Sequence, residues 1–449
     1  MAISTFFGLH TALRGILAQQ RSLDVTTHNI ANANTVGYSR QEALLESSPA
    51  FIYPGMNTPA GAGQIGTGVD VTQYRRVRDA FIDVQLRAQT MRHGYYETTR
   101  DGLEQVELAF AEPGDTGLNT LLSRFWDAWQ DVSDAPENLA TRQALVQASA
   151  SLAEGFRSVD AQLTTIAGQS AADLTLTMNE VNSIGAQILD LNVQIANVRA
   201  MGDQPNDLFD KRDVLIDRLA QLGNVTVTPG ALDVVDVTIG GATLVTGTTG
   251  SATLVEADLT SLTSGKLAAL QTLRDTTLPG YRSSLDAVAA SLVAQVNAAH
   301  TAGFDLAGAT GQAFFAAGGT TAATLAVDAA VLADPRLVAA SAAAGQPGNA
   351  DVALQIAGLR ANTGIDVAYQ QLVTRLGSDG QEAGRALANA ILLTDALHDR
   401  RDSVSGVSMD EEMSNLVRFQ RGFQASARAL NAMDEMIDLL INRTGRVGL

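Results

Sequence analysis

Four aspartates with spacings of three and four residues are the strongest candidates for chemistry in this sequence. They are Asp207, Asp210, Asp213 and Asp217. On a helix this spacing puts the carboxylates on roughly one face, and converging carboxylates can hold Mg²⁺ or Ca²⁺. One helix supplies only part of a coordination shell, however, and basic residues interrupt the run at Lys211, Arg212 and Arg218. The pattern therefore predicts a solvated, salt-bridged helix face, and we expect no metal site.

Residues 61–66 read Gly-Ala-Gly-Gln-Ile-Gly, which has the glycine spacing of a dinucleotide-binding loop. That fingerprint binds a pyrophosphate only where a strand precedes it and a helix opens directly after it. Here Pro54, Gly55, Asn57 and Pro59 precede the glycines, and a strand-like run follows. The segment is therefore predicted to be a loop, and no nucleotide cofactor is expected.

The other residue types that could act in catalysis form no recognisable group. The histidines are scattered at His10, His28, His93, His300 and His398. The sequence contains no His-Glu-x-x-His pair and no Gly-x-Ser-x-Gly nucleophile elbow. Cysteine is absent, which excludes thiol catalysis, disulfide bonds and cysteine-ligated metals. We therefore expect no enzyme, no catalytic residue and no cofactor.

Charge and hydropathy exclude further classes of function. The formal net charge of −18 would repel a phosphate backbone, so nucleic acid is not an expected partner. No apolar run approaches the roughly 18 residues needed to cross a bilayer, so no membrane insertion is expected. The N-terminal stretch lacks the basic start and apolar core of a cleaved secretory signal. These features alone predict a cytoplasmic protein.

Apolar residues repeat in steps of three and four at both ends of the chain, which predicts two helices with heptad seams. The N-terminal seam, in a helix expected over 4–30, comprises Leu9, Leu13, Ile16, Leu23 and Ile30. The C-terminal seam comprises Leu416, Phe419, Phe423, Leu430, Met433, Ile437 and Leu440. Periodicity alone favours two amphipathic helices packed on one globular core. The apolar area of such a pair is small for the residues that it must order, so we expect both helices to need neighbours from this chain or from other subunits.

Helical patterns also predominate between the two ends. They cover residues 76–110, 118–132, 139–199, 207–222, 265–300 and 365–403. Extended segments are expected at 40–53 and 69–74, and short strands at 234–239, 242–246 and 253–255 indicate a small sheet. The predicted fold class is therefore mainly α.

One short run near the N-terminus is recognisable as a family motif. Asn29-Ile30-Ala31-Asn32-Ala33-Asn34-Thr35 is followed by Gly37-Tyr38-Ser39-Arg40-Gln41. The surrounding segment 22–43 resembles the N-terminal signature of flagellar rod, hook and hook-associated proteins, and its ending resembles the hook-associated branch. Residues 405–445 resemble the terminal helix of the same family, and residues 202–219 and 273–306 resemble body segments of that branch.

The resemblance implies discontinuous, nested domains in which both chain ends return to one domain. Residues 1–40 with 405–449 are expected to form an inner coiled-coil polymerisation domain. Residues 41–230 with 263–404 are expected to form a long helical bundle. Residues 231–262 are expected to form a small β insert, a reduced form of the outer β domains that many relatives carry.

The resemblance also implies a structural function at the hook–filament junction. The subunit would assemble with its own copies at the hook tip and couple hook to filament, with the seam residues as the assembly interface. Other implied partners are hook protein, the second hook-associated junction protein, a cytoplasmic export chaperone that binds the C-terminal seam, and the flagellar type III export apparatus. Such subunits are secreted through that apparatus without a cleaved signal peptide, so the implied location is extracellular.

Two alternative functions remain open. Another flagellar axial protein, such as a hook or distal rod subunit, would share the terminal helices. The middle regions of those proteins are mostly β, which disagrees with the helices expected at 139–199 and 265–300. A helical extracellular adhesin or binding module would share the helices but would not polymerise.

Overall fold

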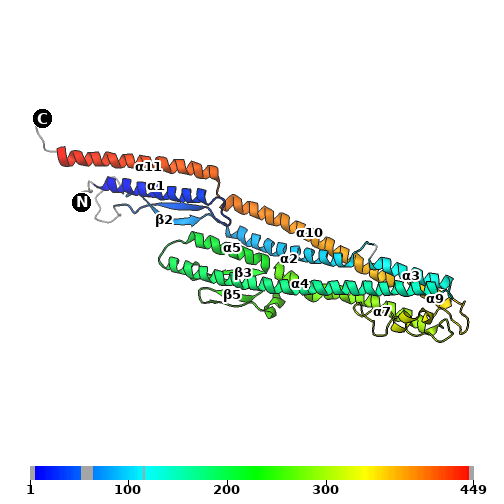
Figure 1. Ribbon diagram of the computed structural model, residues 1–449. Helices are drawn as coiled ribbons and strands as arrows, with labels where there is room; N and C mark the ends of the chain where they lie inside the picture. The colour runs from blue at the N-terminus through cyan, green and yellow to red at the C-terminus, as the bar shows by residue number, and fades with distance from the viewer. Residues whose placement is uncertain (1–5, 52–63, 115–116, 444–449) are drawn as a thin grey trace.

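The protein is a long rod of helices in a computed structural model that describes residues 6–51, 64–114 and 117–443 (Figure 1). The fold is mainly α, as the sequence predicts. The first and last described helices lie side by side at one end of the rod, so the two ends of the chain meet there. We call this end proximal and the opposite end distal.

The proximal end consists of a helix pair and a hairpin. Helices α1 (Phe7–Ala31) and α11 (Met409–Asp438) are antiparallel. Strands β1 (Gln41–Ser47) and β2 (Val69–Arg76) form an antiparallel hairpin that packs on α1, with a register shift between Leu44 and Leu45. The extended segments expected at 40–53 and 69–74 are thus confirmed at 41–47 and 69–76, while residues 52–53 lie outside the described ranges.

The rod itself is a bundle built around one very long helix, α4 (Leu139–Ala200), of 62 residues. Asn138 begins it, because its side-chain oxygen accepts a hydrogen bond from the amide of Ala140 at 2.9 Å. The other helices of the bundle are α2 (Ala80–Phe110), α3 (Leu118–Asp134), α5 (Asn206–Leu222), α6 (Gly265–Thr272), α7 (Leu278–Ala302), α8 (Ala329–Ala333), α9 (Asp351–Asn362) and α10 (Ile365–Ser405). A single π-helical turn, Leu273–Thr277, joins α6 to α7.

A small antiparallel sheet packs on the proximal half of α4. Its strands are β3 (Val225–Pro229), β4 (Val235–Ile239), β5 (Ala242–Thr246) and β6 (Gly250–Ser251), in that spatial order. The strands expected at 234–239 and 242–246 are present. The strand expected at 253–255 was wrong: those residues are irregular, and the short edge strand lies just before them. The sheet also includes β3, which the sequence patterns did not indicate.

Buried apolar side chains form two separate cores. The distal core lies among α2, α3, the first half of α4, α7, α9 and α10, and includes Phe125, Trp126, Trp129 and Phe156. The proximal core lies among the second half of α4, α5, α6 and the four-stranded sheet. No buried residue belongs to both cores within the described ranges.

Candidate functional site: the terminal helix pair and its anchor

Small residues bring α1 and α11 together. A Cβ at Gly8 would lie 2.8 Å from Sδ of Met433, and a Cβ at Gly15 would lie 3.0 Å from Oγ of Ser426. On the other helix, a Cβ at Gly422 would lie 2.8 Å from the side-chain amide of Gln19. The helices therefore approach closely at positions where a larger side chain would separate them.

The predicted N-terminal seam is not the row of α1 that is buried. The buried residues of α1 are Ala18, Ser22, Thr26 and Asn29. Of the predicted seam, Leu13 is 40% exposed, and Leu9, Ile16, Leu23 and Ile30 are half-buried. Leu17, which was not part of that seam, is 46% exposed. The apolar stripe of α1 thus lies about one residue round the helix from the contact with α11. The seven-residue repeat Gly8, Gly15, Ser22 and Asn29 was the signal in the sequence that could have located this contact.

The predicted C-terminal seam is the half-buried row of α11. Leu416, Phe419, Phe423, Leu430, Met433 and Ile437 are half-buried, while Leu440, in the π-helical turn after α11, is 54% exposed. The one buried residue of α11 is polar, Glu412. No large apolar side chain of either terminal helix is therefore fully buried in the single chain.

The family motif forms the joint that fixes the helix pair to the rod. The side-chain amide of Asn29 donates to the carbonyl of Gln41 at 2.8 Å and to Glu412 at 3.2 Å, and its Oδ1 accepts from the amide of Gln41 at 2.9 Å. Tyr38 donates to the same Oδ1 at 2.7 Å and lies 2.9 Å from Nδ1 of His28. Asn29 is 1% exposed, so one buried amide ties α1 to the chain after the motif and to α11.

The remaining motif residues extend this joint to α5, α10 and α11. Ser39 donates from its amide and its hydroxyl to Asp210, at 3.0 and 2.8 Å. Arg40 pairs with Glu411 at 2.7 Å and with Glu412 at 2.9 Å, and its amide donates to the carbonyl of Ser405.

The turn within the motif requires glycine at one position. Gly37 has a φ of +77°, and a Cβ there would lie 2.1 Å from Val214 of α5. Asn32 donates to the carbonyl of His28 at 3.0 Å, which closes the last turn of α1, and Asn34 is exposed.

The aspartates of α5 lie in a partly buried ion-pair network beside this joint. Arg76 pairs with Asp210 at 2.8 Å and with Asp213 at 2.9 Å. Arg78 lies 2.5 Å from Asp213, and Asp217 pairs with Arg87 and Arg401. The prediction of a solvated face was wrong for two of them, because Asp210 is 5% exposed and the Asp213 side chain 15%.

The charge balance of this network is visible in the pKa of its central carboxylate. Burial alone would raise the pKa of Asp213, but the attraction of Arg78 and then Arg76 outweighs burial and lowers it. Burial would lower the pKa of Arg78, and Asp213 raises it above the ordinary value. Asp213 therefore stays ionised, and the positive charges of Arg76 and Arg78 balance its negative charge.

The described residues do not form the metal or nucleotide sites that the aspartate and glycine patterns raised. Asp207 faces away from the network, toward Gln41 at 2.9 Å and His28 at 3.8 Å. Among the described residues, no three histidine or acidic side chains converge in a way that could hold a metal ion. Half of the Gly-Ala-Gly-Gln-Ile-Gly run, residues 61–63, lies outside the described ranges; residues 64–66 are an irregular segment before β2. Within the described ranges, no helix has the length and apolar character to cross a bilayer.

Comparisons with known proteins place these features in a class, the flagellar axial proteins. Residues 103–260 and 252–315 match the family described as flagellar hook-associated protein FlgK helical domain. Residues 9–38, which cover most of α1 and most of the motif, match the flagella basal body rod protein family. Residues 401–443, which span α11, match the family described as flagellar basal body rod FlgEFG protein C-terminal.

Individual relatives narrow the class. Flagellar hook-associated protein 1 of Bacillus subtilis is 32% identical over 98% of this chain and 99% of its own length. Its namesake in Escherichia coli is 26% identical over 69% of this chain and 60% of its own length. A solved structure of the flagellar hook junction protein FlgK from Burkholderia pseudomallei is 27% identical over 52% of this chain and 46% of that chain, with a TM-score of 0.47. The chain belongs to the flagellar hook-associated protein 1 family.

Proposed function

We propose that this protein is a structural subunit of the hook–filament junction, that it assembles with copies of itself at the hook tip, and that it has no catalytic role. One observation carries the proposal: α1 and α11 bury no large apolar side chain, although both carry apolar stripes. Burial of such side chains is the main stabilising contribution in folded proteins, so stripes left half-exposed fit a surface that other subunits cover.

In this proposal the domains divide the work. Residues 1–40 with 405–449 polymerise, and the bundle of 41–230 with 263–404 forms the body of the subunit. The small insert at 231–262 forms a reduced outer domain. The motif network transmits load between the first two, because Asn29, Ser39 and Arg40 join the helix pair to the rod through buried hydrogen bonds and ion pairs.

The proposed partners follow from the location. Hook protein and the second hook-associated protein would flank the subunit, and the flagellar type III export apparatus would secrete it without a cleaved signal. A cytoplasmic chaperone would cover the α11 row that includes Phe419, Phe423 and Leu430 before secretion, because that row is only half-buried in the single chain.

The direct test is electron microscopy of flagella from a strain that lacks this gene. Hooks without filaments are expected, and wild-type filaments on such a strain would contradict the proposal.

Complementation with Leu13→Asp then tests the surface. Leu13 is 40% exposed and lies outside the α1–α11 contact, so a charge there should leave the monomer folded yet prevent filament growth. Leu354→Asp is the matched control, because Leu354 is exposed on α9 at the distal end and should tolerate the same charge. Equal complementation by both variants would refute the assignment of the α1 stripe.

A further inference from the structure

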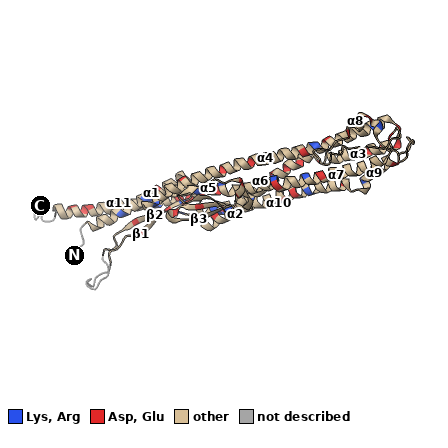
Figure 2. Cartoon of the chain, turned by 90° about the horizontal axis from the view of Figure 1, so that it is seen from below, with Lys and Arg blue, Asp and Glu red and all other residues tan. Residues whose placement is uncertain are grey.

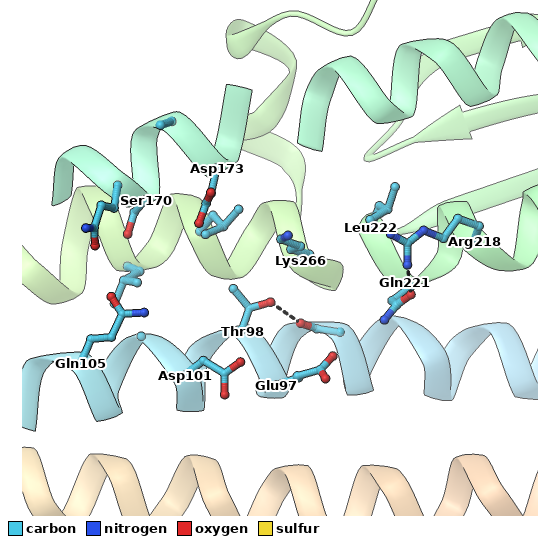
Figure 3. A pocket seen from close by; sticks show the side chains of 16 residues that line it. Glu97, Thr98, Asp101, Gln105, Ser170, Asp173, Arg218, Gln221, Leu222 and Lys266 are labelled. Atoms are coloured by element: carbon cyan, nitrogen blue, oxygen red, sulfur yellow. Dashed lines mark hydrogen bonds between the residues drawn. The ribbon is translucent and has the colours of Figure 1, made fainter. Parts of the chain in front are cut away.

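The boundary between the two cores is a polar hollow halfway along the rod. A cavity of about 610 Å³ lies there among α2, α4, α5 and α6. Figure 3 shows Glu97, Asp101 and Gln105 on α2 along one side of it and Asp173 of α4 and Lys266 of α6 on the other. We call the segments that line this cavity the waist.

Both cores stop at the waist on α4 and on the helix formed by α6, the π-helical turn and α7. Along α4 the distal core ends at Ile166 and the proximal core begins at Leu174, with the buried polar residue Ser170 between them. Along the helix formed by α6 and the π-helical turn, the proximal core ends at Leu270 and the distal core begins at Leu273. The apolar packing that makes a bundle cooperative is therefore interrupted at one level in these two helices, while α10 runs on beside α2 and its buried Leu387 and Ala390 belong to neither core.

The backbone is irregular at the same level. The π-helical turn Leu273–Thr277 interrupts the helix formed by α6 and α7, and a Cβ at Gly102 would lie 2.4 Å from Leu273. π-helical turns are one of the identifiable causes of helix kinks.

Near the waist, side-chain hydroxyl groups of α2, α4 and α6 donate hydrogen bonds to backbone carbonyls of their own helix. Thr98 donates to the carbonyl of Gly94 at 2.9 Å, Ser170 to Ile166 at 2.9 Å, Thr177 to Asp173 at 2.7 Å and Thr272 to Ala268 at 2.8 Å. Such bonds compete with the helix hydrogen bonds and favour bending.

We propose that the rod consists of two separately cooperative halves joined at a flexible waist. The proximal half holds the sheet and the assembly end, and the distal half holds the aromatic core. Opening or bending at the waist leaves both cores packed, since neither core extends through it. The subunit can therefore deform between its assembly end and its distal tip without unfolding either half.

The two tryptophans make the proposal testable, because both lie in α3 and report on the distal half alone. Urea unfolding of the full chain is followed by tryptophan fluorescence for wild type, Leu152→Ala in the distal core and Ile188→Ala in the proximal core. Leu152→Ala should lower the urea midpoint measured by fluorescence, and Ile188→Ala should leave that midpoint unchanged. Circular dichroism reports on both halves, and Ile188→Ala should lower the midpoint of a separate transition that belongs to the proximal half. An equal shift of the fluorescence midpoint by both variants overturns the proposal.

Hydrogen exchange provides a second readout that needs no variant. Amides of α4 between residues 166 and 177 should exchange on the order of tenfold faster than those of the same helix on either side. Uniform protection along α4 overturns the flexible waist. Ser170→Leu combined with Thr177→Leu should join the two apolar rows of α4 and remove this region of fast exchange. Equally fast exchange in a folded double variant would overturn the proposal.

Discussion

The imidazole of His300 lies at the centre of the distal core and is 0% exposed. Its Nε2 accepts a hydrogen bond from the amide of Ala339 at 2.8 Å, and its Nδ1 lies 2.5 Å from the carbonyl oxygen of Gln312. A carbonyl only accepts, so Nδ1 carries the proton and the ring is neutral. A second proton on Nε2 would point at the N–H of Ala339, which is also a donor, so protonation would break that hydrogen bond. Burial lowers the pKa of His300 to about 4, although the hydrogen bond to Gln312 acts in the opposite direction.

We expect acid to destabilise the distal core through this one side chain. In the unfolded chain His300 becomes protonated below its ordinary pKa of about 6.5, whereas in the folded chain it becomes protonated only near pH 4. The free energy of unfolding therefore falls as the pH is lowered across that interval. The loss should reach about 3 kcal/mol at pH 4. Urea midpoints from tryptophan fluorescence at pH 7, 6, 5 and 4 measure it. In His300→Gln this part of the pH dependence should vanish, and an identical profile in the variant would contradict the assignment.

The network around Asp213 predicts a large difference between two aspartates of one helix. Asp213→Asn leaves Arg76 and Arg78 without their shared partner and should lower the free energy of unfolding by about 3 kcal/mol. Asp207→Asn is the control, and because that carboxylate is 59% exposed the loss should stay below about 1 kcal/mol. Chemical denaturation at pH 7 compares them. The lowered pKa of Asp213 also means that its contribution is present at neutral pH and is lost as the pH falls through that value.

The sequence predicts which aspartates share a face but not what they contact. Spacing alone aligned Asp210, Asp213 and Asp217, and the interleaved bases suggested partners on the same helix. Arg212 instead donates to Asn192 of α4 and to the carbonyl of Asp233, in the short turn before β4. The true partners, such as Arg78 and Arg401, are 135 and 184 positions away, and no local pattern can indicate a contact between residues so far apart.

At the scale of elements, the close approach of α1 and α11 predicts that a glycine-to-leucine substitution is destabilising at their contact and harmless elsewhere. Gly15→Leu should separate the two helices, because even a Cβ would lie 3.0 Å from Ser426. Gly384→Leu is the matched control in α10, where nothing lies within 4 Å of a Cβ, and it should be neutral or slightly stabilising. Hydrogen exchange in residues 7–31 and 409–438 compares the variants. Unchanged protection in Gly15→Leu would mean that the contact is not close in solution.

Elements with a strong period were predictable, and those formed by distant packing were not. The long helices α2, α4, α7 and α10 carry helical patterns in the sequence, and the structure confirms them within a few residues. Helix α9 escaped notice because it follows an Ala/Gly-rich stretch without a clear start signal. Strand β3 escaped because its pairing with β4, not its own five residues, makes it a strand. The small residues of α1 that meet α11 gave a weaker signal than its leucines, which stay predicted as the assembly interface.

At the scale of the whole molecule, net charge should govern how readily copies meet. Basic and acidic residues are interleaved along the rod (Figure 2), yet the chain carries a formal net charge of −18. Two copies therefore repel each other at low ionic strength, and raising the salt from about 10 to about 150 mM shortens the screening length from about 30 to about 8 Å. Light scattering of purified protein should show faster association at the higher salt. Association that weakens with salt would indicate an interface dominated by ion pairs instead.

The meeting of the two chain ends also fixes an order of events. The bond between Asn29 and Glu412 spans 383 positions, so a ribosome completes α1 long before it makes the helix that packs on it. At about 5–20 residues per second, the delay is roughly 20–80 s. During that interval the nascent chain has no finished helix pair to offer a neighbour. In the proposed assembly, the complete surface of the helix pair therefore becomes available to other copies only after α11 has been synthesised.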